Sequence, residues 1–170
     1  MALISNVEFK ALRDIGNKVD ESKLTEVIDL AQKGELYDLL GNFLFDVIAN
    51  VGDAADYDDL LDGSTFTKSG DTYTHAGLKA VLADLAYSRY LVVLNPNFTP
   101  FGLTYKDSED LERVDKETLN RLVLNAQKDA DAKMRIIRIF MGENMDTFSR
   151  FYDDGNPDLG FNKKRWSVIN

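Results

Sequence analysis

The fold of this chain is decided by two stretches, residues 78–94 with the sequence LKAVLADLAYSRYLVVL and residues 115–145 with the sequence DKETLNRLVLNAQKDADAKMRIIRIFMGENM. In both stretches apolar side chains recur every three or four residues, which is the spacing of an α-helix. The first helix is expected over about 76–94, and it is apolar on two sides, which is typical of a central helix in a bundle. The second would span about 45 Å at 1.5 Å per residue, which is long for one domain, so one end is expected to project.

Two amphipathic helices are expected before this pair. Asp20 or Ser22 caps the first, and Gly34 marks a break after it. A second helix over 36–51 contains Gly41, which costs about 1 kcal/mol relative to Ala and therefore indicates close approach of another helix. The apolar positions of the two helices are Leu24, Val27, Ile28 and Ala31 in the first, and Leu36, Leu40, Phe43, Leu44, Val47, Ile48 and Val51 in the second.

The remaining segments complete the expected architecture. Residues 53–63, DAADYDDLLDG, predict a short acidic helical turn ended by glycine. Alternating Thr and aromatic residues around Ser69-Gly70-Asp71 predict a β-hairpin over about 64–75, which must lean on the helical body or on a neighbouring chain because an isolated hairpin is only marginally stable. Residues 1–20 fit either a short helix or an extended arm. We therefore expect a mainly α fold, a bundle of about four to five helices with an inserted small β-hairpin over 1–150, followed by an extended C-terminal tail over 151–170.

Composition narrows the classes of function. The chain has no cysteine and its only histidine is His75, so it offers no thiol nucleophile, no cysteine-based zinc site and almost no proton shuttle at neutral pH. Of the net charge of −9, the whole imbalance lies in residues 1–62, with 14 acidic and 5 basic side chains. An acidic surface repels phosphates, which disfavours sequence-specific DNA binding. The chain shows no signal peptide and no apolar run long enough to span a bilayer. Because it has no cysteine, disulfides play no part, and a cytoplasmic origin is expected.

No catalytic or metal-binding motif stands out. The aspartates of residues 53–62 lack the glycine and glutamate positions of a calcium-binding EF-hand loop, so a solvated acidic face is the favoured interpretation. The chain has no phosphate-binding glycine loop and no nucleophile elbow. His75, at the end of the hairpin, is interpreted as a surface or capping residue. No cofactor and no metal site are expected.

Cations and aromatic residues suggest contact surfaces instead. Arg121, Lys128 and Arg135 recur at seven-residue steps and indicate a mixed-charge exposed helix face or a face for salt bridges between subunits. Aromatic residues and arginine dominate the hot spots of protein interfaces. The aromatic residues of the loop after the first long helix fit the domain's own core or an interface equally, whereas those of the tail favour an interface. The residues concerned are Phe98, Phe101 and Tyr105 in the loop, and Phe161, Lys163, Lys164, Arg165 and Trp166 in the tail.

The order of elements, together with the stretches Leu36–Leu44, Leu78–Leu94 and Gly102–Glu112, resembles the head–tail connector (adaptor, or neck) proteins of tailed bacteriophages and prophages, especially those of phages that infect gut Bacteroidetes. The resemblance covers about residues 20–145 and includes no catalytic motif. It implies a non-enzymatic structural subunit that forms a ring, usually of twelve copies, below the portal protein. Such a ring extends the DNA channel, links to the next tail or neck protein and lets DNA pass without specific binding. The expected place is the virion, and the host cytoplasm during assembly.

The resemblance also implies roles for two groups of residues. In connector proteins the C-terminal segment often reaches toward the portal, which would place Lys163, Lys164, Arg165 and Trp166 at that contact. The acidic first third would suit a channel wall, because like charge disfavours adhesion of DNA phosphates. The candidates for such a channel-facing surface are Asp56, Asp58, Asp59 and Asp62.

Two other classes of function stay open. One is an acidic helical binding or inhibitory module, of the DNA-mimic or immunity type, which would stay monomeric or dimeric and depend on the aspartates of residues 53–62. The other is a carboxylate-dependent enzyme, which would show a deep pocket with shifted carboxyl pKa values.

Overall fold

The computed structural model describes residues 2–13, 15, 19–93, 96–99, 102–105 and 116–153. The elements in chain order are α1 (Asn6–Leu12), α2 (Glu21–Ala31), η1 (Gln32–Leu36), α3 (Tyr37–Leu40), α4 (Phe43–Ala49), α5 (Ala55–Asp62), β1 (Thr65–Lys68), β2 (Asp71–Thr74), α6 (Gly77–Val93), β3 (Pro96–Thr99), β4 (Gly102–Tyr105), α7 (Lys116–Glu143) and α8 (Ser149–Asp153). The predicted fold class is confirmed: the chain is mainly α-helical with a small inserted hairpin, β1–β2.

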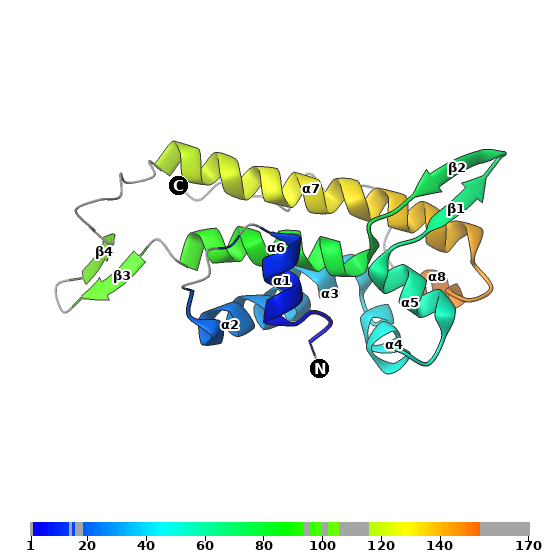
Figure 1. Cartoon of the computed structure of the whole chain (residues 1–170), viewed down its shortest axis with the longest axis horizontal. Coiled ribbons are helices and arrows are strands. Elements are labelled where there is room, and N and C mark those ends of the chain that lie inside the picture. Colours follow the sequence, from blue (N-terminus) through cyan, green and yellow to red (C-terminus); the bar gives the residue numbers. More distant parts are fainter. Residues whose placement is uncertain are drawn as a thin grey trace.

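Helix α6 is the centre of the body. Helix α7 lies along one side of it, α2 lies on the other, and the short α1 crosses it (Figure 1). Because neighbours cover α6 from several directions, buried side chains occur all around it, and Leu78, Leu82 and Leu85 are fully buried. The apolar residues on two sides of this helix therefore predicted its central place correctly.

Helix α2 begins as expected but does not end at Gly34. The carboxylate of Asp20 accepts a hydrogen bond from the backbone N–H of Ser22 (2.9 Å), and the predicted apolar stripe of α2 is buried. The chain then continues through the π-helical η1 into α3, so the predicted break at Gly34 is wrong. A Cβ at Gly34 would lie 3.0 Å from Nη2 of Arg89, so this glycine serves close approach of a side chain from α6 rather than a turn.

The break comes at Gly41 instead, so the prediction of one helix through this residue is also wrong. Gly41 has φ 59° and ψ −143°, a backbone conformation that is essentially restricted to glycine, and it ends α3 before α4 begins. Leu40 and Phe43, on the two sides of the break, are both fully buried. The apolar spacing thus continues across a break in the backbone, which explains why the spacing alone suggested a single helix.

The hairpin β1–β2 sits against the chain's own body. Gly63 ends α5 as predicted, and Phe66 of β1 pairs with Tyr73 of β2. Ser69 and Gly70 form the turn with positive φ values of 53° and 90°, which suits a tight two-residue hairpin turn. Phe66 is 9% exposed and lies 5.6 Å, centroid to centroid, from the ring of Phe140 on α7. This aromatic contact gives the short hairpin the support it needs.

A second hairpin occupies part of the segment expected to be a loop. Strands β3 and β4 pair antiparallel, with Phe98 opposite Leu103 and Pro96 opposite Tyr105. Pro96 is the first residue of β3, a position where a strand tolerates proline. The expectation of a loop is therefore wrong for these eight residues, because the prolines around them were read only as loop signals.

Helix α7 has two unlike halves. Its 28 residues correspond to about 42 Å, and it extends past the start of α6 to the end of the body where β1–β2 and α8 lie (Figure 1). Its buried residues begin only at Ala126, so the first ten residues of the helix contribute no fully buried side chain. At the other end, Phe148 and Phe151 are buried in an aromatic cluster with Phe43 of α4, so α8 belongs to the body.

Candidate functional site

The predicted contact residues divide between described and undescribed parts of the chain. The tail residues Phe161, Lys163, Lys164, Arg165 and Trp166 lie outside the described residues, as does Phe101. Phe98 and Tyr105 lie on β3 and β4 in the register given above. Their assignment to an interface stays a prediction.

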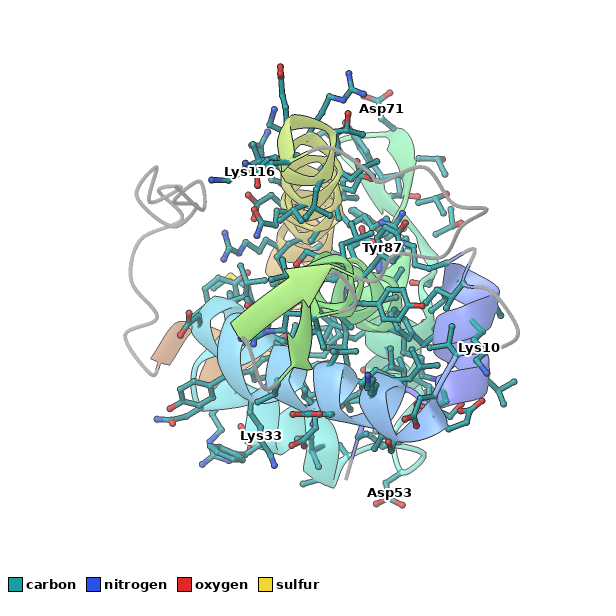
Figure 2. All side chains as sticks on the ribbon, turned by 90° about the vertical axis from the view of Figure 1, so that its left-hand side faces the viewer. Lys10, Lys33, Asp53, Asp71, Tyr87 and Lys116 are labelled. Carbon is teal, nitrogen blue, oxygen red and sulfur yellow. The ribbon has the colours of Figure 1, made fainter. Side chains whose placement is uncertain are left out.

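The three predicted cations of α7 lie on its exposed side. Arg121, Lys128 and Arg135 are all solvent-exposed, while the opposite side of α7 packs on α6. Figure 2 looks from the end at which Lys116 begins α7, and charged side chains extend outward from this helix. Arg135 also borders a hollow of about 420 Å³ whose other lining residues include Lys68, Arg138, Met145 and Tyr152. The structure thus brings the cations onto one accessible helix, which suits a protein contact.

The aspartates of α5 are not a uniform free acidic face. The carboxylate of Asp62 lies 2.7 Å from Nζ of Lys79, and that of Asp58 accepts a hydrogen bond from the backbone N–H of Gly52 (3.0 Å). Asp56 accepts a hydrogen bond from Oγ1 of Thr147 (3.0 Å), and Asp59 is exposed. Three of the four predicted channel-facing carboxylates therefore hold the local fold, and their role toward DNA stays a prediction.

A buried charged network joins α1, α6 and α7. Asp84 is 1% exposed; its carboxylate pairs with the guanidinium of Arg13 and lies 2.7 Å from Nζ of Lys133. Arg13 also lies 3.7 Å from a carboxylate oxygen of Asp129, and its guanidinium stands 5.3 Å from the centre of the Tyr87 ring. Burial raises the pKa of Asp84, and Lys133 and Arg13 oppose that rise. The network fixes the short α1 to the two long helices.

Sequence reasoning missed this network. The signal was present, since Asp84 interrupts the apolar surface of a helix that was expected to be central. A buried carboxylate needs a cationic partner, but nothing in the sequence identifies Arg13 and Lys133 as those partners. The arrangement leaves Asp84 1% exposed, so it suits a structural clamp better than a catalytic group.

The prediction that His75 is a surface or capping residue is wrong. The side chain is 2% exposed, its Nε2 lies 3.1 Å from Oγ of Ser64, and its ring centroid lies 4.3 Å from that of Phe140. Burial lowers the pKa of His75, while Asp59 acts in the opposite direction. Because β1–β2 folds back onto α7, the residue that follows the hairpin is carried into the core.

An apolar groove, here called the end groove, opens between α2, α6 and the first half of α7. It encloses about 250 Å³, and the ion pair between Arg89 Nε and Glu35 Oε2 (2.8 Å) lies among its lining residues. Leu30 and Val93 line it while 41% and 42% exposed. Its apolar walls are Val27, Leu30, Val92, Val93, Val123 and Leu124. The groove lies beside the start of α7, where the first ten residues of the helix have no fully buried side chain.

A pair of aromatic rings, here called the aromatic knob, lies exposed on α3 and α4. Phe45 is 61% exposed and Tyr37 is 37% exposed, and their ring centroids lie 6.0 Å apart. The hydroxyl of Tyr37 donates a hydrogen bond to Oδ1 of Asn42 (3.1 Å). Sequence reasoning missed this pair, although Phe45 stands off the apolar stripe that was identified for its helix.

Two further observations bear on the class of function. Among the described residues, no group of three or more His, Cys, Asp or Glu side chains is placed to hold a metal ion. No helix in this part of the chain is both long and apolar enough to cross a membrane.

Comparison with known proteins places the chain in a family. Residues 36–158 match the model of DUF6712, described as a family of unknown function, and because the match covers well over half of the chain, the protein belongs to this family. Neither the curated proteins nor the solved structures contain a match to the chain.

Proposed function

We propose that this protein is a non-enzymatic head–tail connector subunit of a tailed bacteriophage or prophage, which forms a ring below the portal and extends the DNA channel toward the tail. The resemblance in element order, described above, motivates the proposal. The mainly helical body with an inserted hairpin agrees with it. The partners of such a subunit are other copies of itself, the portal protein and a tail or neck protein.

The exposed apolar surface at the start of α7 supports this proposal best. Leu122 is 38% exposed, and Leu119 and Val123, which share its side of the helix, are only partly buried. Exposed apolar side chains that lie together on one side of a helix suit a contact with another protein. A ring subunit needs such contacts, since each copy must bury part of its surface against its neighbours.

The acidic inhibitory module is the weaker alternative. A DNA mimic would present its carboxylates in a free array, yet Asp56, Asp58 and Asp62 are each bonded within the chain. Of the three, Asp62 is paired with a cation, Lys79, which reduces the local negative charge that a basic partner would meet. Asp53, Asp56, Asp59 and Asp62 are all exposed, so the channel-wall hypothesis retains these carboxylates.

The experiment that tests the proposal is mass photometry of the purified chain, alone and mixed with the portal protein of the same genome. A ring-sized species, or a complex with the portal, is the expected result. Deletion of residues 159–170 should abolish portal binding if the tail makes that contact. A chain that stays monomeric and ignores the portal would overturn the proposal.

A further inference from the structure

His75 closes the base of the hairpin β1–β2. Ser64 precedes β1 and His75 follows β2, and the backbone N–H of His75 donates a hydrogen bond to the carbonyl oxygen of Ser64 (3.0 Å). The side chains of the same two residues also meet, with Nε2 of His75 3.1 Å from Oγ of Ser64. The hairpin projects at the end of the body where α7 finishes (Figure 1). The state of the His75 side chain therefore affects how the hairpin joins the body.

The ring of His75 lies in a largely apolar site between the hairpin and α7. Its centroid is 4.3 Å from that of Phe140 on α7 and 6.1 Å from that of Phe66 on β1, and neither of these rings carries a charge. The charged group that acts on the ring is Asp59 of α5. Within the part of the chain that the structure describes, the buried Nδ1 atom of His75 has no hydrogen-bond partner.

This site suits the neutral form of the ring. A neutral imidazole carries one N–H, and we assign it to Nε2, which can donate it to Oγ of Ser64, so that Nδ1 is left as an acceptor. Protonation would add an N–H at Nδ1 that has no acceptor, and it would place a charge away from water. Burial lowers the pKa of His75 for this reason, although Asp59 opposes the effect.

We propose that His75 is a pH-sensitive latch, which holds β1–β2 against α7 while its ring is neutral and releases the hairpin when Nδ1 takes up a proton from the solvent. Release exposes the ring to water, which can accept hydrogen bonds from both N–H groups. A released hairpin also loses its own structure, because an isolated two-stranded hairpin is only marginally stable. This inference goes beyond the proposed connector function and does not depend on it.

The expected effect follows from the uptake of one proton. The ordinary pKa of histidine is 6.5, and the pKa of His75 is lowered in the docked state. The docked state is therefore favoured above pH 6.5, and its advantage is lost as the pH falls below that value. The ratio of released to docked hairpin should rise by at most about tenfold for each pH unit below 6.5.

Asp84 is a second buried group that could respond to acid, and its place in the fold separates the two responses. Burial raises the pKa of Asp84, whose partners are Arg13 and Lys133. Protonation of Asp84 would loosen the contacts that join α1, α6 and α7, whereas protonation of His75 acts on β1–β2. A response to acid that is confined to the hairpin therefore points to His75.

The test is amide hydrogen exchange of the full-length chain at pH 7 and pH 5.5. Exchange rates are expressed as protection factors, which removes the pH dependence of the exchange chemistry itself. In the wild type the protection of β1 and β2 should fall by up to about tenfold at pH 5.5, while that of α6 changes less. Because His75 is the only histidine, its ring signal in NMR gives its titration in the same samples without ambiguity.

Two variants separate the latch from a general weakening of the hairpin. His75→Gln removes the titrating ring but keeps a polar group for Ser64, so the protection of β1 and β2 should no longer depend on pH in this range. Lys68→Gln is the matched control, because it removes the ion pair of the hairpin with Glu143 (3.0 Å) and leaves His75 in place. It should lower hairpin protection by the same factor at both pH values and keep the pH dependence of the wild type.

Three results would overturn the latch. The first is a hairpin protection in the wild type that is equal at pH 7 and pH 5.5, and the second is an equal fall in β1–β2 and in α6. The third is a pH dependence that persists in His75→Gln. Circular dichroism checks that both variants fold, and if His75→Gln does not, the wild type and Lys68→Gln still decide the first two results.

Discussion

Substitution of Gly77 tests how the hairpin is attached to the body. Gly63 ends α5 and Gly77 begins α6, and their backbones meet at the base of β1–β2 with positive φ values of 95° and 79°. A Cβ at Gly77 would lie 2.2 Å from the carbonyl oxygen of Leu61 and 2.6 Å from the carbonyl carbon of Asp62. Ordinary contacts of a Cβ begin at 3.4 Å, so Gly77→Ala forces the two backbone segments apart by about 1 Å.

Gly77→Ala should lower the free energy of unfolding in two ways, and the variant Gly52→Ala measures the first of them alone. Gly52 has a similar positive φ of 76°, but a Cβ there would meet nothing within 4 Å. Gly52→Ala should therefore lower the free energy of unfolding only by the cost of the left-handed conformation, about 1–2 kcal/mol. Gly77→Ala adds the cost of overpacking, about 1–3 kcal/mol. At this chain length the difference corresponds to an extra fall in Tm of about 2–12 °C.

Urea unfolding followed by circular dichroism measures both variants, and hydrogen exchange measures the hairpin. In Gly77→Ala the backbone amides of β1 and β2 should exchange faster relative to those of α6, because the substitution loosens the base of the hairpin first. Equal losses of stability in the two variants would refute the reasoning. Such a result would mean that the close approach of Gly63 and Gly77 adds nothing beyond their backbone conformation.

Three further predictions concern the core. Asp84→Ala should lower the free energy of unfolding by about 3 kcal/mol, the low end for a broken buried ion pair, because Arg13 and Lys133 keep 22% and 33% of their side-chain surface exposed. Joint replacement of Asp84, Arg13 and Lys133 by apolar residues should recover most of this loss in the same urea titration. Because burial lowers the pKa of His75, the contribution of this residue to stability is present above pH 6.5, the ordinary pKa of histidine, and is lost as the pH falls below that value. The free energies of unfolding at pH 7 and pH 5.5 should therefore differ more in the wild type than in His75→Gln. Phe9→Ala should lower the free energy of unfolding by about 3–5 kcal/mol. Because Phe9 is the one fully buried residue of α1, hydrogen exchange in this variant should show α1 opening before the rest of the body.

The sequence predicted those features that depend on local spacing. The buried face of α2, the end of α5 at Gly63 and the turn at Ser69-Gly70 all follow from short-range rules, and the structure contains each of them. The sequence predicted a break at Gly34 and a continuous helix through Gly41, and the structure shows the reverse. Glycine allows both conformations, and the close approach of Arg89, which favours the helix at Gly34, depends on how α6 packs rather than on the local sequence.

The buried charged network around Asp84 could not be predicted from the sequence for a different reason. Its members are 71 and 49 residues from Asp84 in sequence, so their meeting depends on how α1 and α7 pack on α6. The knob and the groove depend on the same packing, since Leu30, Val93 and Leu124 come from three different helices. A single sequence indicates which faces are apolar, but it does not indicate which of them remain uncovered once the helices have packed.

Under the proposed connector function, weak contacts through the uncovered faces would let the chain be monomeric when isolated and still form a ring. Burying one aromatic side chain contributes about 1.5–3 kcal/mol, which falls short of the cost of bringing two proteins together. An open row of copies has one contact fewer than it has copies, whereas a closed ring gains that last contact without immobilising a further copy. A portal that holds several copies side by side raises their effective concentration and removes most of the remaining cost. If the proposed function holds, a weak contact between copies therefore favours assembly on the portal over assembly in free solution, which is why the oligomers should be sought both with the portal and without it.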